Sequence, residues 1–236
     1  MNLHKIAGLT VDLGYKYPRM KAQAEPYKYD GESAKPDMTI YLSDVFLEEK
    51  SRETGFDLDS CEYIYTGAAF NSGIIHFGGI MLHSSAVILD GAAYLFSADS
   101  GTGKSTHTKL WLEAFGDARA RILNDDKPVV RVAKNGVFAC GTPWSGKDDS
   151  SSCENVPLAG ICFLERSEKN WIKRVEGKEV VGKFMRQTIR PPKVGEMNLV
   201  LSLADKILTG VPVYTMGCNI STDAAKMAYE AMRPQE

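Results

Sequence analysis

The chain has 236 residues, with 28 Lys and Arg residues against 30 Asp and Glu residues and a formal net charge of −2. Hydrophobic residues make up 44% of the sequence and charged residues 25%, which excludes a disordered, collagen-like or coiled-coil chain. The near-neutral charge argues against a nucleic-acid partner, which favours a basic excess. The apolar stretches near residues 74–96 are interrupted by polar residues and argue against a membrane-spanning segment.

The N-terminal sequence and the cysteines indicate a cytoplasmic protein. Residues 1–7 do not form the charged segment and apolar stretch of a secretory signal. The five cysteines are odd in number, and no pair has C-x-x-C spacing, which argues against a zinc ribbon or a disulfide framework. We therefore expect reduced thiols in a cytoplasmic chain.

Residues 1–72 are expected to form strands and loops that pack on the core of a single domain. Loose alternation predicts a strand over residues 5–13, and the polar composition of residues 15–35 favours short strands joined by loops. Residues 38–47 suit a strand or a short helix. Apolar residues at helical spacing predict a buried helix over residues 63–79.

The remaining chain, residues 73–236, is expected to form an α/β core. Asp90-Gly91 joins two apolar runs as a hairpin turn pair, and a glycine-rich loop then leads into a helix over residues 105–115 that ends at Gly116. Further strands are predicted at residues 121–123, 129–132, 137–140, 158–164, 171–175 and 211–216, and further helices at 180–187, 197–209 and 222–232. Because hairpin signals join several neighbouring strands, the sheet is expected to be mixed.

The strongest signal is a phosphate-binding loop. Residues 98–105 match the pattern G-x-x-x-x-G-K-[ST], with Ala98 in place of the first glycine. Such glycines turn backbone N–H groups toward phosphate oxygens, and a helix N-terminus adds unpaired donors. Lys104 would contact the β- and γ-phosphates and Ser105 a Mg²⁺ ion. The sequence thus predicts a P-loop nucleotide-binding core in which ATP is held by Asp99, Ser100, Gly101, Thr102, Gly103, Lys104, Ser105 and Thr106.

The adjacent acids Asp125 and Asp126 follow a predicted strand. A carboxylate placed there, near a phosphate loop, would meet a metal ion or an attacking hydroxyl group. On an extended chain neighbouring side chains point in opposite directions, so only one acid would face the nucleophile unless the chain bends. The alternative is a solvated turn, which the composition of residues 124–128 also suits.

Three kinds of supporting residue are candidates. His83 precedes the strand that leads to the loop, although a lone histidine is more often a core residue, and His107 in the first turn of the helix is a weaker candidate for lining the nucleotide site. Arg186 and Arg190, four residues apart, are predicted to share a helix face and meet the transferring phosphoryl group; a solvated helix end is the alternative. The long polar loop at residues 141–155 suits a lid or a surface excursion equally.

The segments 82–87, 100–106 and 124–126 resemble the HPr kinase/phosphorylase and PEP carboxykinase superfamily, and more closely its shorter HPr-kinase-related proteins. The resemblance extends over residues 73–236 and includes segments 141–144, 164–166 and 212–214. It implies a mixed sheet flanked by helices, with the loop at one edge of a cleft. It also implies that Asp125 accepts the proton of the substrate hydroxyl, that Asp126 lies near the metal, and that His83 contacts phosphate or metal.

The sequence departs from this family in several places. Thr106 stands where the HPr kinases carry glutamate, and we find neither their separate N-terminal domain nor their glycine-rich capture loop. The metal-binding lysine and the oxaloacetate-binding arginine of PEP carboxykinases have no identifiable counterpart. These departures argue against HPr itself as the acceptor and against decarboxylation.

Together these features predict an ATP-dependent kinase that transfers a phosphoryl group to a hydroxyl, either a protein or peptide serine or a small alcohol. The predicted catalytic residues are Asp125, Lys104, His83, Arg186 and Arg190, and the predicted Mg²⁺ ligands are Ser105 and Asp126. A regulatory nucleotide-binding module and a simple nucleotide hydrolase are the alternatives. Neither a nucleic acid nor a membrane is expected as a partner, and self-association into a homo-oligomer stays open.

Overall fold

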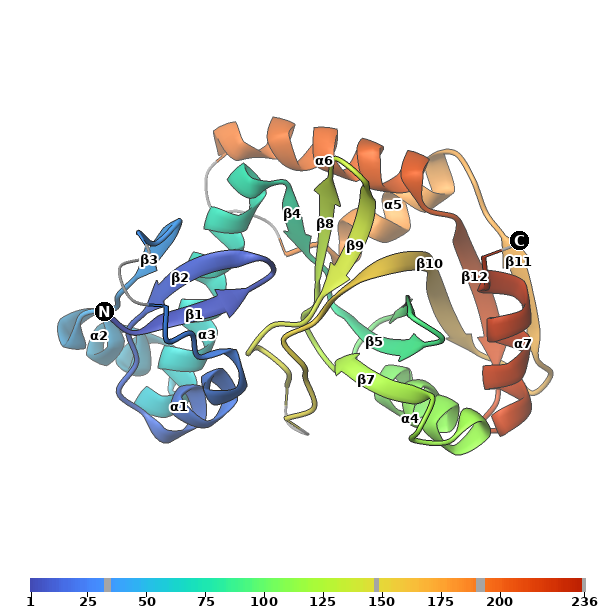
Figure 1. Cartoon of the computed structure of the whole chain (residues 1–236), viewed down its shortest axis with the longest axis horizontal. Coiled ribbons are helices and arrows are strands. Elements are labelled where there is room, and N and C mark those ends of the chain that lie inside the picture. Colours follow the sequence, from blue (N-terminus) through green and yellow to red (C-terminus); the bar gives the residue numbers. More distant parts are fainter. Residues whose placement is uncertain (32–34, 147–148, 190–193, 235–236) are drawn as a thin grey trace.

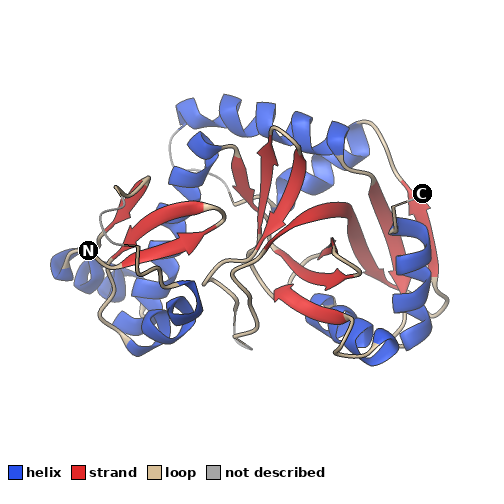
Figure 2. Ribbon diagram, in the orientation of Figure 1, coloured by secondary structure: helices blue, strands red, loops and turns tan. Residues whose placement is uncertain are grey.

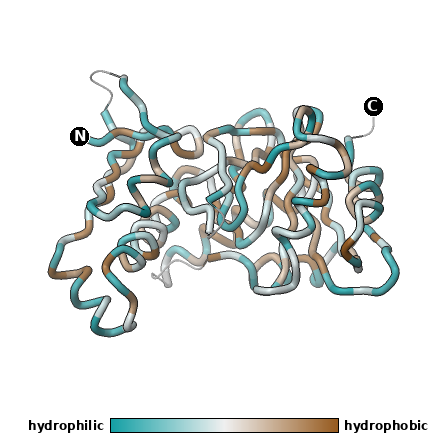
Figure 3. The backbone as a smooth tube through the Cα atoms, turned by 90° about the horizontal axis from the view of Figure 1, so that it is seen from below, coloured by the Kyte–Doolittle hydropathy of each residue, from teal (hydrophilic) through white to brown (hydrophobic). Residues whose placement is uncertain are grey.

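The structure is a computed structural model that describes residues 1–31, 35–146, 149–189 and 194–234. Figure 1 shows a smaller N-terminal lobe beside a larger core that contains the main sheet. Hydrophilic residues follow the outer loops at both ends of the molecule (Figure 3). Within the described residues, no helix has both the length and the apolar character needed to cross a bilayer.

The N-terminal lobe contains a three-stranded sheet and three helices. Strand β1 (Leu3–Ile6) pairs antiparallel with β2 (Leu9–Leu13), which pairs parallel with β3 (Met38–Ile40). The helices are α1 (Pro18–Ala24), α2 (Asp44–Thr54) and α3 (Leu58–Ile74), and a short 3₁₀ turn, η1 (Glu25–Tyr27), follows α1.

Two predictions for this lobe need correction. The single strand predicted over residues 5–13 is a hairpin, because Ala7 (φ 49°) and Gly8 (φ 77°) form a tight left-handed turn. The prediction of short strands over residues 15–35 is wrong for its described middle part, which is α1 and η1. Pro18 occupies the first helical position, where its fixed φ suits a helix start, and the helix buries Met20 against the lobe.

Within the described residues, the core sheet has nine strands: β4 (Gly79–Met81), β5 (Ser84–Leu89), β6 (Ala92–Ser97), β7 (Ala120–Asn124), β8 (Val129–Ala133), β9 (Gly136–Cys140), β10 (Asn155–Arg166), β11 (Trp171–Arg174) and β12 (Val213–Cys218). Their order is β4-β8-β9-β10-β6-β5-β7. In addition, β12 pairs with β10, and β11 pairs with β12. Strand β10 pairs antiparallel with β9 at its start and parallel with β6 and β12 further on. The mixed sheet predicted from the hairpin signals is therefore confirmed, and it is visibly curled (Figure 1).

Helices cover both faces of this sheet (Figure 2). Helices α5 (Lys178–Gln187) and α6 (Met197–Gly210) pack on one face, and α4 (Lys104–Phe115) and α7 (Thr222–Met232) on the other. Short 3₁₀ turns, η2 (Ile75–Phe77) and η3 (Val194–Glu196), precede β4 and α6. On β5, Ala86 and Ile88 belong to the hydrophobic cluster under α5 and α6, whereas Val87 and Leu89 belong to the cluster under α4 and α7. The strand is thus buried on both faces, which explains the apolar run over its residues 86–89.

Candidate active site

The loop between β6 and α4 has the backbone that the sequence pattern predicts. Gly101 (φ 78°) and Gly103 (φ 118°) are left-handed, whereas Ala98 is not. A Cβ atom on either glycine would meet nothing within 4 Å, so the backbone conformation, not lack of space, favours glycine here. Gly103 caps α4 without a side-chain hydrogen bond. The N–H groups of the first turn thus lack a side-chain cap, as an anion site requires.

A cavity of about 530 Å³ lies over this loop and collects most of the predicted site residues. Its lining consists of His83, Ser100, Gly101, Gly103, Lys104, Ser105, Thr106, Asp125, Asp126 and Gly146. We call it the acid cavity. Two predicted loop residues line neighbouring cavities: Thr102 lines a cavity of about 760 Å³ that also contains His107, and Asp99 lines a smaller one of about 170 Å³.

Lys104 is buried, and its Nζ donates a hydrogen bond of 3.0 Å to the carbonyl oxygen of Ala98. Burial lowers the pKa of this ammonium group, while the nearby carboxylates of Asp126 and Asp125 act in the opposite direction. One cation therefore faces two acids across a cavity that has room for phosphate groups.

Asp125 directly follows β7 and is attached to the neighbouring strand β5. Ser85 Oγ donates to Asp125 Oδ1 at 2.6 Å, and it also contacts Thr108 Oγ1 of α4 at 2.8 Å. The backbone N–H of Asp125 donates to the carbonyl oxygen of Ser150 at 3.1 Å. These contacts connect the acid to the helix that begins at the glycine-rich loop.

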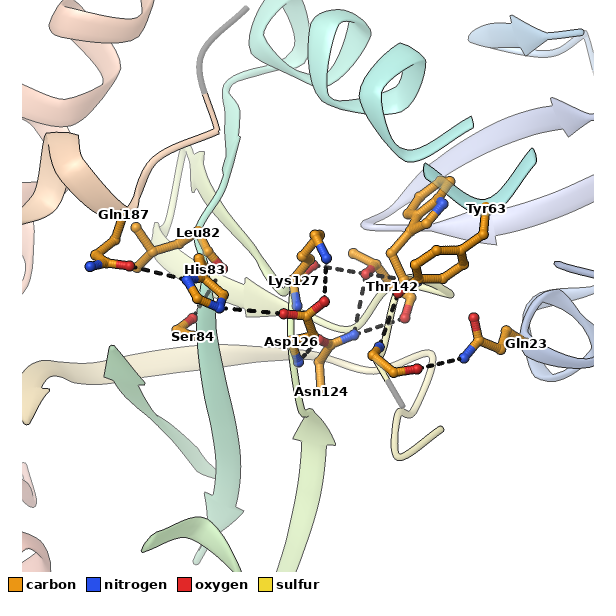
Figure 4. Close-up of polar contacts among 12 residues, drawn as sticks. Gln23, Tyr63, Leu82, His83, Ser84, Asn124, Asp126, Lys127, Thr142 and Gln187 are labelled. Carbon is orange, nitrogen blue, oxygen red and sulfur yellow. Dashed lines mark hydrogen bonds and ion pairs between the residues drawn. The ribbon is translucent and has the colours of Figure 1, made fainter. Parts of the chain in front are cut away.

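The chain bends directly after Asn124, and this bend brings both acids to one cavity. The buried Asn124 Oδ1 accepts hydrogen bonds from the backbone N–H groups of Asp126 (3.0 Å) and Lys127 (2.7 Å), an Asx turn. Asp126 forms an ion pair with Lys127 and lies 3.6 Å from His83 Nε2 (Figure 4). An extended chain would have turned one of the acids away.

His83 lies at the edge of the acid cavity and contacts a residue that the sequence analysis did not select. Its Nδ1 lies 3.1 Å from Gln187 Oε1 (Figure 4). Gln187 Nε2 in turn donates to Asp99 Oδ1 at 2.9 Å. Burial and the charge of Lys104 lower the pKa of His83, against the effect of Asp126. A glutamine in the last turn of a helix matches no motif, so only the structure reveals this contact.

Only one of the two predicted arginines lies within the described residues. Arg186 lines the small cavity beside Asp99 rather than the acid cavity. Helix α5 ends at Gln187, and Thr188 is extended and bridges to Leu82. Arg190 lies outside the described residues, as do Lys147 and Asp148 of the long loop, so the predicted helix face shared by the two arginines stays a prediction.

Residues of the N-terminal lobe hold Gly146, which lines the acid cavity, in place. The N–H of Gly146 donates to Tyr63 Oη at 3.0 Å, and its carbonyl oxygen accepts from Arg19 and Gln23 at 3.2 Å each. Two residues earlier, Trp144 is buried in the lobe. The described part of the 141–155 loop is therefore held by contacts with the N-terminal lobe. The local sequence did not indicate these contacts.

No protein-family model matches the chain, and no curated protein matches it. Among solved structures, the Hpr(Ser) kinase/phosphatase from Coxiella burnetii is similar with a TM-score of 0.37 and 10% sequence identity. The match covers 64% of this chain and 93% of that chain. Similarity at this level does not assign the chain to a family.

Proposed function

We propose that this protein is an ATP-dependent kinase that transfers the γ-phosphoryl group to a hydroxyl group. One observation carries the proposal: an uncapped glycine-rich helix start, a buried lysine and a strand-end carboxylate line the same cavity. The first two features suit the phosphates of a nucleotide. The third feature suits a general base, which accepts the proton that an attacking hydroxyl must lose.

In the proposed reaction the loop N–H groups and Lys104 hold the β- and γ-phosphates. The oxygen of the acceptor hydroxyl forms a bond to the γ-phosphorus as the bond to the β-phosphate oxygen breaks, and ADP leaves. Asp125 takes the hydroxyl proton, and Ser85 keeps its carboxylate oriented. Catalysis then consists mainly of positioning and charge stabilisation.

The cavity also suits Mg²⁺. The described residues contain no group of three or more His, Cys, Asp and Glu side chains that could hold a metal by themselves. Mg²⁺ is usually held by one or two carboxylates together with substrate phosphates and water. Ser105 and Asp126 line the acid cavity and offer such oxygen ligands. When bound, Mg²⁺ would neutralise charge on the transferring phosphoryl group.

The neighbouring cavity of about 760 Å³ suits the nucleoside part of the donor. It shares Gly101, Gly103 and Thr106 with the acid cavity, and Leu110 and Ile220 contribute apolar surface to it. A nucleotide with its phosphates at the loop would therefore find an apolar surface next to them. The acceptor is proposed as a class only, a protein or peptide serine or a small alcohol.

The decisive experiment measures ADP formation with Mg²⁺ and ATP against a panel of hydroxyl metabolites and serine peptides. If the protein is a kinase, ADP should form faster with one of the acceptors. Asp125→Asn should lose this acceptor-dependent increase while still binding ATP, and Lys104→Met should lose ATP binding. Asp117→Asn is the matched control, because Asp117 is an exposed acid outside the cavity.

Two outcomes would overturn the kinase proposal. Indifference to Asp125→Asn together with retained ATP binding would indicate a regulatory nucleotide-binding module. Equal phosphate release with and without every acceptor would indicate a nucleotide hydrolase.

A further inference from the structure

The backbone holds His83 independently of any side chain of α5. The His83 N–H donates to the carbonyl oxygen of Gln187 at 2.9 Å, and the His83 carbonyl oxygen accepts from Ser97 Oγ at 2.7 Å. The preceding residue, Leu82, bridges to Thr188. The backbone position of His83 therefore does not depend on the Gln187 side chain, which leaves the contact between the two side chains to be explained.

The orientation of the Gln187 amide is determined by its second partner. An ionised carboxylate only accepts hydrogen bonds, so the group 2.9 Å from Asp99 Oδ1 is the NH₂ group of Gln187. The amide oxygen therefore faces His83 Nδ1 at 3.1 Å. Because a carbonyl oxygen also only accepts, Nδ1 of His83 must carry a hydrogen.

The hydrogen on Nδ1 means that the other ring nitrogen, Nε2, carries none when the ring is neutral. A neutral imidazole has a single N–H group, so Nε2 of His83 is a bare acceptor. It lies 3.6 Å from Asp126 Oδ1, a second acceptor, and both residues line the acid cavity. Two such acceptors side by side require a donor, and they repel a phosphate oxygen.

We propose that Gln187 is a positioning residue that fixes His83 in its Nδ1–H tautomer, so that Nε2 and Asp126 together receive an O–H group in the cavity. The O–H group belongs to water, free or held by Mg²⁺, because the acceptor hydroxyl gives its single hydrogen to Asp125; this identity rests on the proposed function. The tautomer itself follows from the contacts of Asp99, Gln187 and His83. On this basis His83 does not donate to a phosphate, in contrast to a role that the family resemblance allows.

The test is long-range ¹⁵N–¹H NMR of the uniformly labelled protein at pH 8, with the His83 signals assigned through His83→Gln. Wild type should show a protonated Nδ1 and an unprotonated Nε2. In Gln187→Leu the acceptor is lost, and the ring should shift toward the Nε2–H tautomer that free imidazole side chains prefer. Gln187→Glu combined with Asp99→Asn keeps an acceptor oxygen for Nδ1 and a donor–acceptor pair between positions 99 and 187. This double variant should keep the wild-type pattern, whereas a purely packing role would not separate it from Gln187→Leu.

Two results for the protein without added ligand would overturn the proposal: a protonated Nε2 in the neutral wild-type ring, or the same tautomer in Gln187→Leu as in wild type. Adding ADP with and without Mg²⁺ identifies the O–H source. A shift of the Nε2 resonance only with Mg²⁺ assigns the O–H group to metal-held water, and an unchanged resonance assigns it to water that is present without the metal. A hydrogen appearing on Nε2 when ADP binds would show donation to phosphate and contradict the proposal. None of these readouts needs turnover, so a failed kinase assay leaves the tautomer result interpretable.

Discussion

Ser85 Oγ and Asp125 Oδ1 are joined by a hydrogen bond of 2.6 Å that crosses from strand β5 to the end of the neighbouring strand β7. The register of the sheet produces this contact. Ala86 pairs with Asn124 in the antiparallel β5–β7 ladder, so the residues one step further along face each other. Ser85 is fully buried, so its hydroxyl contacts the acid from inside the protein.

Replacing Ser85 with alanine should lower kcat by roughly tenfold to a hundredfold with little change in the KM for ATP. A hydrogen bond to a charged group contributes about 1.5–3 kcal/mol, and Ser85 contacts the acid rather than the glycine-rich loop. Steady-state kinetics of the identified acceptor reaction measure this effect. Ser84→Ala is the matched control, because Ser84 is equally buried but donates to the carbonyl oxygen of Leu82. Equal losses in both variants would show that Ser85 acts only through packing.

The free energy of unfolding should fall between pH 6.5 and pH 4 because of His107. The ring is buried against Phe96 with centroids 4.5 Å apart, and Nε2 accepts from Trp111 Nε1 at 3.3 Å. Burial lowers the pKa of His107 from 6.5 to about 4. In this pH window the unfolded chain binds the proton and the folded chain does not, so stability is lost as the pH falls. The loss approaches about 3 kcal/mol at the acid end of the window.

Urea unfolding of wild type and His107→Gln at pH 7, 6 and 5 measures this contribution. Glutamine can still accept from Trp111 but does not titrate, so the variant should have a flatter dependence on pH. Parallel pH profiles for the two proteins would show that another group causes the acid sensitivity.

Trp144→Ala should lower the free energy of unfolding by about 3–5 kcal/mol, which is usual when a buried aromatic side chain is removed. Trp144 is 1% exposed, stacks on Phe70 at 4.8 Å between ring centroids, and donates to Thr66 Oγ1 at 3.3 Å. Because Gly146 follows it in the cavity wall, the same change should also weaken nucleotide-dependent stabilisation. Urea unfolding and thermal shifts with Mg²⁺ and ATP check both effects.

Gly67→Ala provides an independent variant for the same contact. Its new Cβ atom would lie 2.9 Å from Trp144 Cδ1, so it should destabilise the lobe without removing the aromatic ring. Trp171→Ala, on the outer strand β11 where the side chain is only half-buried, serves as the control and should cost less. A loss as large at Trp171 as at Trp144 would contradict the importance of the lobe contact.

Much of the core could be predicted because its signals are local. Asp90-Gly91 forms the predicted turn between β5 and β6, Gly116 ends α4 in a left-handed conformation, and Ser221 caps α7 through Ala224. Each of these depends on a few consecutive residues. The N-terminal lobe was predicted poorly, because the polar composition of residues 15–27 hides their helical structure. This segment is stabilised by burial of Met20 and Tyr27 in a hydrophobic cluster to which other segments of the chain contribute.

The glycine-rich loop could be predicted from local sequence, because the left-handed backbone at Gly101 and Gly103 and the helix start at Lys104 depend on neighbouring residues. The residues that face this loop could not, because they come from distant parts of the chain. Ser85 reaches Asp125 over 40 positions, and Gln187 reaches His83 over 104. Such contacts depend on the register of the strands and on where α5 ends, which packing of the whole core determines and no short stretch of residues encodes.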